Sequence, residues 1–440
     1  MSAWPPATGG VPDPMEWTFY PPQADARTVA CAANTRKWGV GMGSWDNYTT
    51  GQRVKLLRGT DFTQESLAEA AGVSVGTIRK IEQNGTVSLP TLMRVSEALH
   101  SDVSVLVGQQ APRRAMAAAD RAALRQLSLV VHDTAAGIGT DAPPPDAQAH
   151  STALAAAWDL YQQGDYSGAA RTVAPLVGQA AAAVAAAPAD RVCAARGVLS
   201  DCYRLAAYCA NLMGARDLAY AAVGHAQAEA TQASDPLREA LVASGRSWVY
   251  LRDARLEQAQ QVSERAATSI EPRYSDSDPK RLAVYGCHIV FAAVVASRRG
   301  DADGAGDLLS HAHAVGARMG GDLTTNGVSF GPVYAAAQAV GISVALGQAG
   351  KALTLGKSMG DRSALQQATQ NRLALDLAAA QCDARMWDTA LDSLMEVCTE
   401  HPEWARHQAL PVIIGRRIGQ ANKGALRQLG GVLGADLLAG

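Results

Sequence analysis

Aromatic residues are scarce in this chain of 440 residues, and neither sign of charge dominates. Phe, Trp and Tyr together make up 5% of the sequence, whereas hydrophobic residues make up 48% and alanine is abundant. Small apolar side chains let helices pack closely, so the composition favours an all-α protein over a β-sandwich. The formal net charge of −2 does not decide for or against nucleic acid, because a basic footprint can be local. The length predicts two or three domains.

The sequence lacks cysteine pairs at C-x-x-C spacing, a secretory signal and an apolar run long enough for a membrane span. The most apolar segments, such as Leu282–Ser297, which contains His288, are shorter than a membrane span needs. An odd number of cysteines cannot all pair within one chain, and most lie in apolar helical stretches, as in a reduced cytosol. We therefore expect a cytoplasmic protein with no membrane partner. The seven cysteines are Cys31, Cys193, Cys202, Cys209, Cys287, Cys382 and Cys398.

Motifs of catalysis and of cofactor binding are also missing. The sequence has no G-x-S-x-G, Walker loop, H-E-x-x-H or dinucleotide fingerprint. His311 and His313 stand two positions apart, so on a helix they project about 200° apart and cannot chelate one metal ion. Cys202 and Cys209 share a helical face but have no histidine at metal spacing, which favours core packing. We expect no enzymatic activity, no cofactor and no metal site.

Composition divides the chain into five segments. Residues 1–50, rich in Pro, Gly and Trp, predict a disordered extension, and residues 51–108 predict a compact helical unit. Residues 109–146 predict a connecting helix followed by a proline-rich linker. Residues 147–414 predict one helix after another. Residues 415–440 are rich in glycine, so we expect a weakly ordered tail.

Two helix caps and one glycine predict a pair of short helices in the stretch FTQESLAEAAGVSVGTIRKI. Thr63 is placed to cap the first helix, with Phe62 and Leu67 as its hydrophobic staple. Gly72 can take the left-handed conformation that ends this helix. Ser74 is placed to cap the second helix. The pattern predicts two helices joined by a tight turn.

The apolar positions agree with a helix-turn-helix. If Gln64 is counted as the first residue, Ala68 is the fifth, Gly72 the ninth and Ile78 the fifteenth. The small side chain at the fifth position lets the two helices cross closely. With its flanks, the segment TQESLAEAAGVSVGTIRKIEQNG resembles the Cro/repressor-like (XRE) family of bacterial DNA-binding domains over Gly51–Gly108. The resemblance implies a five-helix, lambda-repressor-like domain whose second motif helix enters the major groove of double-stranded DNA.

The same resemblance implies which residues contact DNA. Carried over by position, these are Ser74, Val75, Gly76 and Thr77 near the bases, Arg79 and Lys80 at bases or phosphates, Gln64 anchoring the first helix, and Asn84 at a phosphate. Residues 51–108 contain six basic and six acidic residues, so one copy is formally neutral and should bind weakly. We therefore expect a homodimer on a palindromic operator. The alternative is a helix-turn-helix used only for packing or protein contacts.

A turn residue followed five positions later by alanine recurs along residues 147–414. Because each site lies between two apolar helical runs, the pattern predicts six helical hairpins stacked into a solenoid. The first unit, AWDLYQQGDYSGA, resembles a tetratricopeptide repeat, and RRGDADGA is a fainter copy. Ordinary all-helical packing is the alternative. The pairs are Gly164/Ala169, Gly214/Ala219, Ala254/Ala259, Gly300/Ala305, Gly347/Ala352 and Arg385/Ala390.

The first helix of each hairpin commonly lines the concave side of such a stack. Aromatic side chains interleaved with Arg, Asn and His there are candidates for holding a peptide or an amphipathic small molecule, and the loop Thr324–Pro332 is a candidate rim. The alternative is that these residues only fill the core. The candidate ligand contacts are Tyr203, Asn211, Arg246, Trp248, Tyr285 and His288.

Together these features predict an all-α protein with a helix-turn-helix reader followed by a tetratricopeptide-like α-solenoid. The layout resembles bacterial regulators that sense signalling peptides and actinobacterial XRE regulators with a helical-repeat tail. The resemblance implies a sequence-specific transcription regulator whose repeat region dimerises and senses a peptide or small molecule. The alternative function is a protein-binding scaffold whose helix-turn-helix serves only for localisation on DNA.

Overall fold

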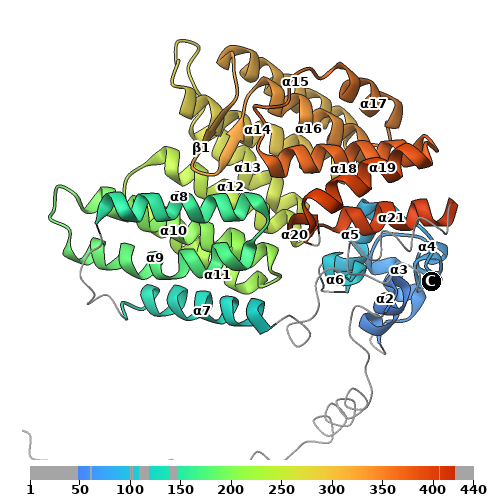
Figure 1. Cartoon of the computed structure of the whole chain (residues 1–440), viewed down its shortest axis with the longest axis horizontal. Coiled ribbons are helices and arrows are strands. Elements are labelled where there is room, and N and C mark those ends of the chain that lie inside the picture. The colour runs from blue at the N-terminus through green and yellow to red at the C-terminus, as the bar shows by residue number, and fades with distance from the viewer. Residues whose placement is uncertain are drawn as a thin grey trace, which may run out of the picture. The chain divides into compact units, whose positions relative to one another are not determined.

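The computed structural model describes residues 48–59, 62–99, 101, 103–108, 118–138, 146–405 and 407–421. Within these ranges the regular structure is helical apart from one short β-hairpin, so the predicted all-α class is confirmed (Figure 1). Most of the predicted N-terminal extension and linker, and the end of the predicted tail, lie outside the described residues.

Five short helices form the predicted helix-turn-helix unit. They are α2 (Thr50–Arg58), α3 (Gln64–Ala70), α4 (Val75–Glu82), α5 (Leu89–Ala98) and α6 (Val103–Val107). Their shared core is fully buried at Val54, Leu67, Ile78, Val95 and Leu106. Each of the five helices contributes one of these side chains. Helices this short are not stable alone, so burial of their apolar faces in the shared core stabilises them.

The predicted caps of the motif are confirmed. The Thr63 hydroxyl accepts a hydrogen bond from the Ser66 amide at 3.0 Å, and the Ser74 hydroxyl accepts one from the Thr77 amide at 3.1 Å. Gly72 has φ +60°, and the amide of Val73 donates to the Ala68 carbonyl at 2.9 Å. This left-handed glycine ends α3 and turns the chain directly into α4.

The repeat region is a stack of six antiparallel hairpins, preceded by α7 (Ala118–Ala135), which packs against α9. Leu127 and Val131 of α7 are fully buried, so this helix extends the core of the stack. The hairpins pair α8 (Ala147–Gln163) with α9 (Tyr166–Ala186), α10 (Val192–Leu212) with α11 (Arg216–Gln232), α12 (Pro236–Arg252) with α13 (Leu256–Ser269), α14 (Pro279–Arg299) with α15 (Ala302–Met319), α16 (Pro332–Ala345) with α17 (Ala349–Ser358), and α18 (Gln367–Asp383) with α19 (Trp387–Glu400).

All six predicted turn sites lie between the paired helices. Every turn residue has a positive φ, from 57° at Ala254 to 92° at Gly164, and every partner alanine is 0% exposed. The left-handed residue reverses the chain, and the alanine lets the second helix approach the first. The predicted hairpins are therefore confirmed.

The two units that resemble tetratricopeptide repeats share one capping arrangement. Asp165 caps α9 and Asp301 caps α15, each accepting a hydrogen bond from the amide of a glycine three residues on, at 2.7 and 2.9 Å. A Cβ on Gly168 or Gly304 would lie within 2.3 Å of the capping carboxylate. The G-D-x-x-G-A pattern therefore reflects a cap that only glycine leaves room for.

The predicted rim loop is a β-hairpin. Strands β1 (Leu323–Thr325) and β2 (Val328–Phe330) pair antiparallel with Thr324 opposite Ser329. The turn residues Asn326 and Gly327 have φ of 45° and 71°, as in a type I′ turn. The ring of Trp158 in α8 lies directly over Gly327, where a Cβ would come within 2.6 Å. The hairpin therefore packs into the stack as part of its wall.

The two ends of the stack meet. Helix α8 contacts α18, and a Cβ on Gly164 would lie 2.5 Å from the Cα of Trp404 in α20 (Pro402–Ala405). Helix α21 (Ala409–Ala421) continues past residue 414, where we expected the ordered part to end, and Ile418 is 1% exposed. The predicted weakness of this segment is therefore wrong as far as residue 421.

Helices α9 and α14 are long and apolar enough to cross a membrane by length and composition alone. However, 50% and 72% of their most apolar windows are buried inside the protein. Both contribute to the hydrophobic clusters of the stack, which accounts for their apolar sequences.

Candidate DNA interface and central cavity

Helix α4 is fixed at both ends. Ser74 caps its start, and at its end Asn84 takes a left-handed conformation with φ 61°. The Gly85 amide donates to the Lys80 carbonyl at 2.7 Å, which completes a C-terminal cap. A Cβ on Gly51 would lie 2.5 Å from the Glu82 carbonyl oxygen, so α2 and the end of α4 touch through backbone atoms. The helix is thus a rigid support for its outward side chains.

The predicted DNA-contacting residues lie on or beside this helix. Arg79 and Lys80 point outward, and the Arg79 side chain keeps 58% of its surface exposed. The described residues therefore leave the face that would meet a duplex uncovered. Ser74, Gly76, Arg79 and Lys80 are exposed, whereas Gln64, Val75, Thr77 and Asn84 are half-buried.

A chain of polar contacts orients the Arg79 guanidinium. Its Nε donates to Gln64 Oε1 at 3.2 Å, and a terminal nitrogen lies 3.3 Å from Glu65 Oε1. Gln64 Nε2 in turn donates to Glu82 Oε2 at 2.6 Å, and Glu82 pairs with Arg58 at 2.7 Å. The Gln64 amide therefore holds Arg79 in place, while the exposed pair with Glu65 is weak enough to be exchanged for a phosphate.

Asn84 has a structural task that the resemblance did not indicate. Its side-chain oxygen accepts a hydrogen bond from the Gly51 amide at 2.9 Å, at the N-terminus of α2. The oxygen therefore caps α2, and its backbone ends α4. The Asn-Gly pair after an apolar helix is the sequence signal of a left-handed C-cap, and it could have been recognised.

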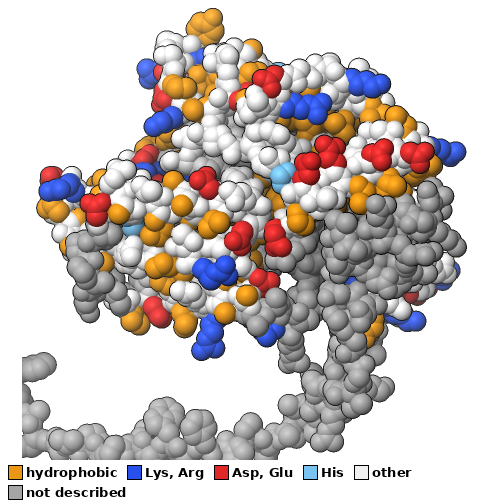
Figure 2. Space-filling view, viewed as in Figure 1, with side chains coloured by type: hydrophobic (Ala, Val, Ile, Leu, Met, Phe, Trp, Pro, Cys, Tyr) orange, Lys and Arg blue, Asp and Glu red, His pale blue; other side chains and the backbone are white. Residues whose placement is uncertain are grey.

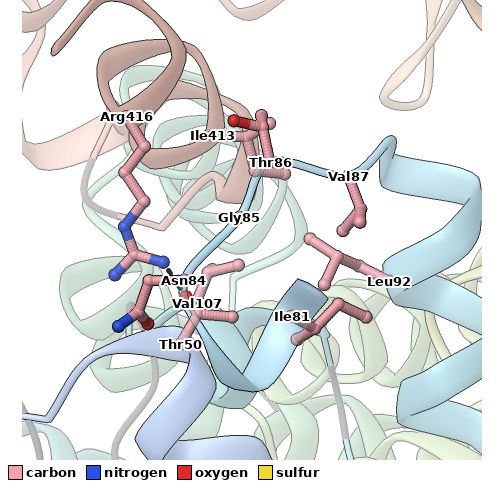
Figure 3. A pocket seen from close by; sticks show the side chains of 10 residues that line it. All are labelled: Thr50, Ile81, Asn84, Gly85, Thr86, Val87, Leu92, Val107, Ile413 and Arg416. Atoms are coloured by element: carbon pink, nitrogen blue, oxygen red, sulfur yellow. Dashed lines mark hydrogen bonds between the residues drawn. The ribbon is translucent and has the colours of Figure 1, made fainter. Parts of the chain in front are cut away.

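Helix α21 docks on the helix-turn-helix domain beside this cap. Arg416 donates to the Thr50 hydroxyl at the start of α2, and Figure 3 shows its guanidinium reaching from α21 toward Thr50 and Asn84. Burial lowers the pKa of Arg416 to about 10. Ile413 lines the same small cavity of about 30 Å³, opposite Val107. Arg416 therefore joins α21 to the start of α2.

The repeat region does not offer an equivalent basic face on α19. In Figure 2 acidic side chains gather along this helix, where Asp388, Asp392, Glu396 and Glu400 recur every fourth residue and are all exposed. Such a row repels the DNA backbone. Contact with a duplex is therefore better supported at α4 than at α19.

A central cavity of about 280 Å³ lies among the first helices of the hairpins. It is lined from α8, α10, α12, α14, α16 and α18, and also by residues of β2 and α20. Four tyrosines contribute to its wall, of which Tyr161 lies 5.7 Å from Tyr208 and 5.3 Å from Tyr166 between ring centroids. Burial raises the pKa of Tyr161 well above its usual value, so its hydroxyl stays protonated.

Two of the six candidate ligand residues line this cavity, Trp248 and His288. His288 is nonetheless satisfied by the protein, because its Nε2 lies 2.9 Å from the Ala240 carbonyl and its Nδ1 lies 3.0 Å from the Ser263 hydroxyl. Burial lowers the pKa of His288 to about 4, so the ring is neutral at physiological pH.

The other four candidates do not line the central cavity. Tyr203 is buried against His225, with ring centroids 5.4 Å apart, and the Tyr285 hydroxyl lies 3.2 Å from His311 Nε2. Arg246 donates to a backbone carbonyl of α11 at 3.5 Å. Asn211 is 0% exposed, and its amide has no hydrogen-bond partner among the described residues.

Sequence reasoning missed the cations near the cavity. Arg298 and Arg372 line it, from α14 and α18, and Arg252 lies close enough for its charge to affect Arg298. Counted from the turn residue of its hairpin, Arg252 and Arg298 both stand at the second position before the turn. This shared register is the signal that could have found them.

One family model matches the chain. Residues 56–106 match a model described as Helix-turn-helix, of the XRE type, which is the region of α2 to α6. No tetratricopeptide family matches, although the hairpins fit a repeat domain. No curated protein and no solved structure matches the chain. The protein thus contains a helix-turn-helix domain of a DNA-binding kind, followed by a helical-repeat region.

Proposed function

We propose that the protein is a sequence-specific transcription regulator that binds operator DNA as a homodimer and responds to a ligand held in its helical-repeat region. The observation behind the proposal is the rigid helix α4, which presents Arg79 and Lys80 outward from a domain of the XRE type. Such a helix fits the major groove, where arginine reads guanine and lysine contacts bases or phosphates. This role implies a cytoplasmic, nucleoid-associated protein.

The charge of the domain supports a dimer. Glu65 and Glu82 accept contacts from Arg79 and Arg58, so the domain has little excess positive charge to attract phosphates. Two copies on one duplex double the contacts, with half-sites about 34 Å apart. Light scattering on the purified chain should give twice the mass of one chain, and the selected DNA sites should be palindromic.

The decisive experiment compares two double variants of the full chain. A duplex library with a randomised centre is enriched on the wild-type protein, and the enriched site is used in mobility-shift titrations. Arg79→Ala/Lys80→Ala should bind at least about tenfold more weakly, because each lost base or phosphate contact contributes about 1–3 kcal/mol. The matched control, Lys351→Ala/Lys357→Ala, removes two exposed positive charges from α17 and should bind as the wild type does.

Absence of any enriched sequence, or equal affinity of the Arg79/Lys80 variant and the wild type, would reject the proposed regulator. The second result would favour a helix-turn-helix that serves only for protein contacts. Circular dichroism of both variants checks that the loss of binding does not come from unfolding.

A further inference from the structure

The guanidinium of Arg298 forms no ion pair with the described residues, although the charge of Asp376 acts on it from nearby. It lines the central cavity, and no hydrogen bond or ion pair joins it to any residue that the structure describes. Burial, and then the charge of Arg372, lower its pKa to about 9, which still leaves it protonated near neutral pH. Arg298 is half-buried, and a cation partly removed from water costs free energy that an entering anion would offset.

The charges around Arg298 are unbalanced. Arg372 uses its Nε for both oxygens of Asp376, at 3.0 and 3.1 Å. Arg252 approaches no carboxylate of the described residues within ion-pair distance, and its Nε is buried without a hydrogen-bond partner. Asp376 is thus shared with Arg372, and Asp383, which lines a neighbouring cavity, pairs with Arg417. No aspartate or glutamate is among the described residues that line the central cavity.

The rest of the wall is aromatic and apolar. Trp248, Phe291 and the four tyrosines surround the space, and protonated hydroxyls such as that of Tyr334 can donate hydrogen bonds to an anion. At about 280 Å³ the cavity lies at the lower end of ligand pockets, which range over about 300–1,000 Å³. A compact molecule fits this volume better than a signalling peptide of several residues does.

We propose that the central cavity binds a small aromatic molecule with a single acidic group, whose negative charge pairs with Arg298 and whose ring lies against the tyrosines. The proposal rests on the proposed function, because it names the chemical class of the ligand to which the regulator responds.

Arg298 also connects the cavity to the DNA-reading domain. Together with Arg372 and Gln338 it lines a second cavity of about 250 Å³. The wall of this cavity also includes Ser88, which caps α5, and Met93, which lies in α5. An anion that draws the guanidinium into the central cavity withdraws charge from the wall beside α5. The bound acid thereby alters the docking of the reader on the repeat region.

Three probes with one ring and different charges test the proposal on the full chain without DNA. Isothermal titration calorimetry is performed with naphthalene-2-carboxylate, its neutral carboxamide and the cationic naphthalen-2-ylmethylamine. The carboxylate should bind with a Kd at least about tenfold lower than that of the amide, because a charged hydrogen bond replaces a neutral one. The amine should bind most weakly.

The variant Arg298→Gln should bind acid and amide within about threefold of each other, whereas Arg299→Gln should keep the wild-type preference. Arg299 is a matched control, because it is the next residue and pairs with Glu257 on the exposed side at 3.5 Å. If Arg298→Gln does not fold, the wild-type probe series alone decides.

Equal binding of acid and amide, a preference for the amine, or a Kd of the carboxylate above about 1 mM would overturn the proposal, as would an acid preference that survives in Arg298→Gln. None of these results depends on DNA. Failure of the ligand proposal is therefore distinct from failure of the mobility-shift experiment, which uses the protein without any probe.

Discussion

Acidification should destabilise the repeat region through His288. The ring lies at 1% exposure between α12 and α13, where its Nε2 donates to the Ala240 carbonyl and its Nδ1 accepts from the Ser263 hydroxyl. The neutral ring satisfies both neighbours, and the Ser263 hydroxyl also reaches the His288 carbonyl at 3.2 Å, so a second ring proton is opposed by the burial of its charge. Burial therefore holds the pKa of His288 at about 4 in the folded protein, against 6.5 in the unfolded chain.

The sign and the size follow from these two values. Below pH 6.5 the unfolded chain binds a proton that the folded protein does not, so the free energy of unfolding decreases as the pH falls. The decrease continues to about pH 4, where the folded protein also binds the proton. A difference of about 2.5 pKa units corresponds to about 3 kcal/mol at 1.36 kcal/mol per unit.

Urea unfolding followed by circular dichroism at pH 7, 5.5 and 4 measures this effect against His288→Gln. The glutamine amide can still donate to Ala240 but does not titrate. The variant should be the less stable protein at pH 7, and the difference in unfolding free energy should shrink by about 3 kcal/mol towards pH 4. Carboxylates titrate in both proteins and cancel in the difference. A constant difference across the three pH values would refute the role given to His288.

Two further predictions concern helix ends and helix packing. Ser74→Ala removes the cap of α4 and should cost about 1 kcal/mol, seen as about fivefold faster amide exchange within α4, while the matched cap variant Ser88→Ala should speed exchange in α5 instead. Unchanged exchange in α4 would contradict the cap. Ala305→Leu should destabilise the repeat region by about 1–3 kcal/mol, since Ala305 is 0% exposed at a helix crossing. Gly306→Ala, where an added methyl group meets nothing within 4 Å, should stabilise it by about 0.5–1 kcal/mol in thermal unfolding. Equal effects at the two neighbouring positions would contradict the packing.

Local chemistry made the hairpins and the motif predictable. Each hairpin needs a residue that tolerates positive φ and an alanine five positions on, and each requirement acts within a few residues. Ala254 and Arg385 take φ of 57° and 60° although neither is glycine. Packing of the following alanine, which is fully buried in both hairpins, outweighs the strain of about 1–2 kcal/mol. The alanine was therefore the more informative half of the signal.

Helix α21 was mispredicted because propensity was judged without its partners. Gly415 and Gly419 each cost about 1 kcal/mol in a helix. Ile414 and Ile418, one turn apart, are 0% and 1% exposed, and burial of each contributes about 1.5–3 kcal/mol. The packing therefore exceeds the cost of the glycines. Its partners in α6, α18 and α19 are distant in sequence, so the sequence alone gave no reason to expect this compensation.

The cavity could be predicted only in part, because the residues that line it are also distant in sequence. The position of a residue within its hairpin predicts more about the cavity than its residue type alone does. When the hairpins are aligned on their turn residues, the second position before the turn is Leu212 in α10, Arg252 in α12 and Arg298 in α14. Leu212 and Arg298 line the central cavity, and the charge of Arg252 reaches Tyr161 on its wall. In these three hairpins the position lies at or near the central cavity, whereas its counterpart in α18, Asp383, is exposed. Arginine at such a position is costly unless it meets an anion, and so a cation in the interior register is better evidence for a ligand than an aromatic residue, which the core alone explains.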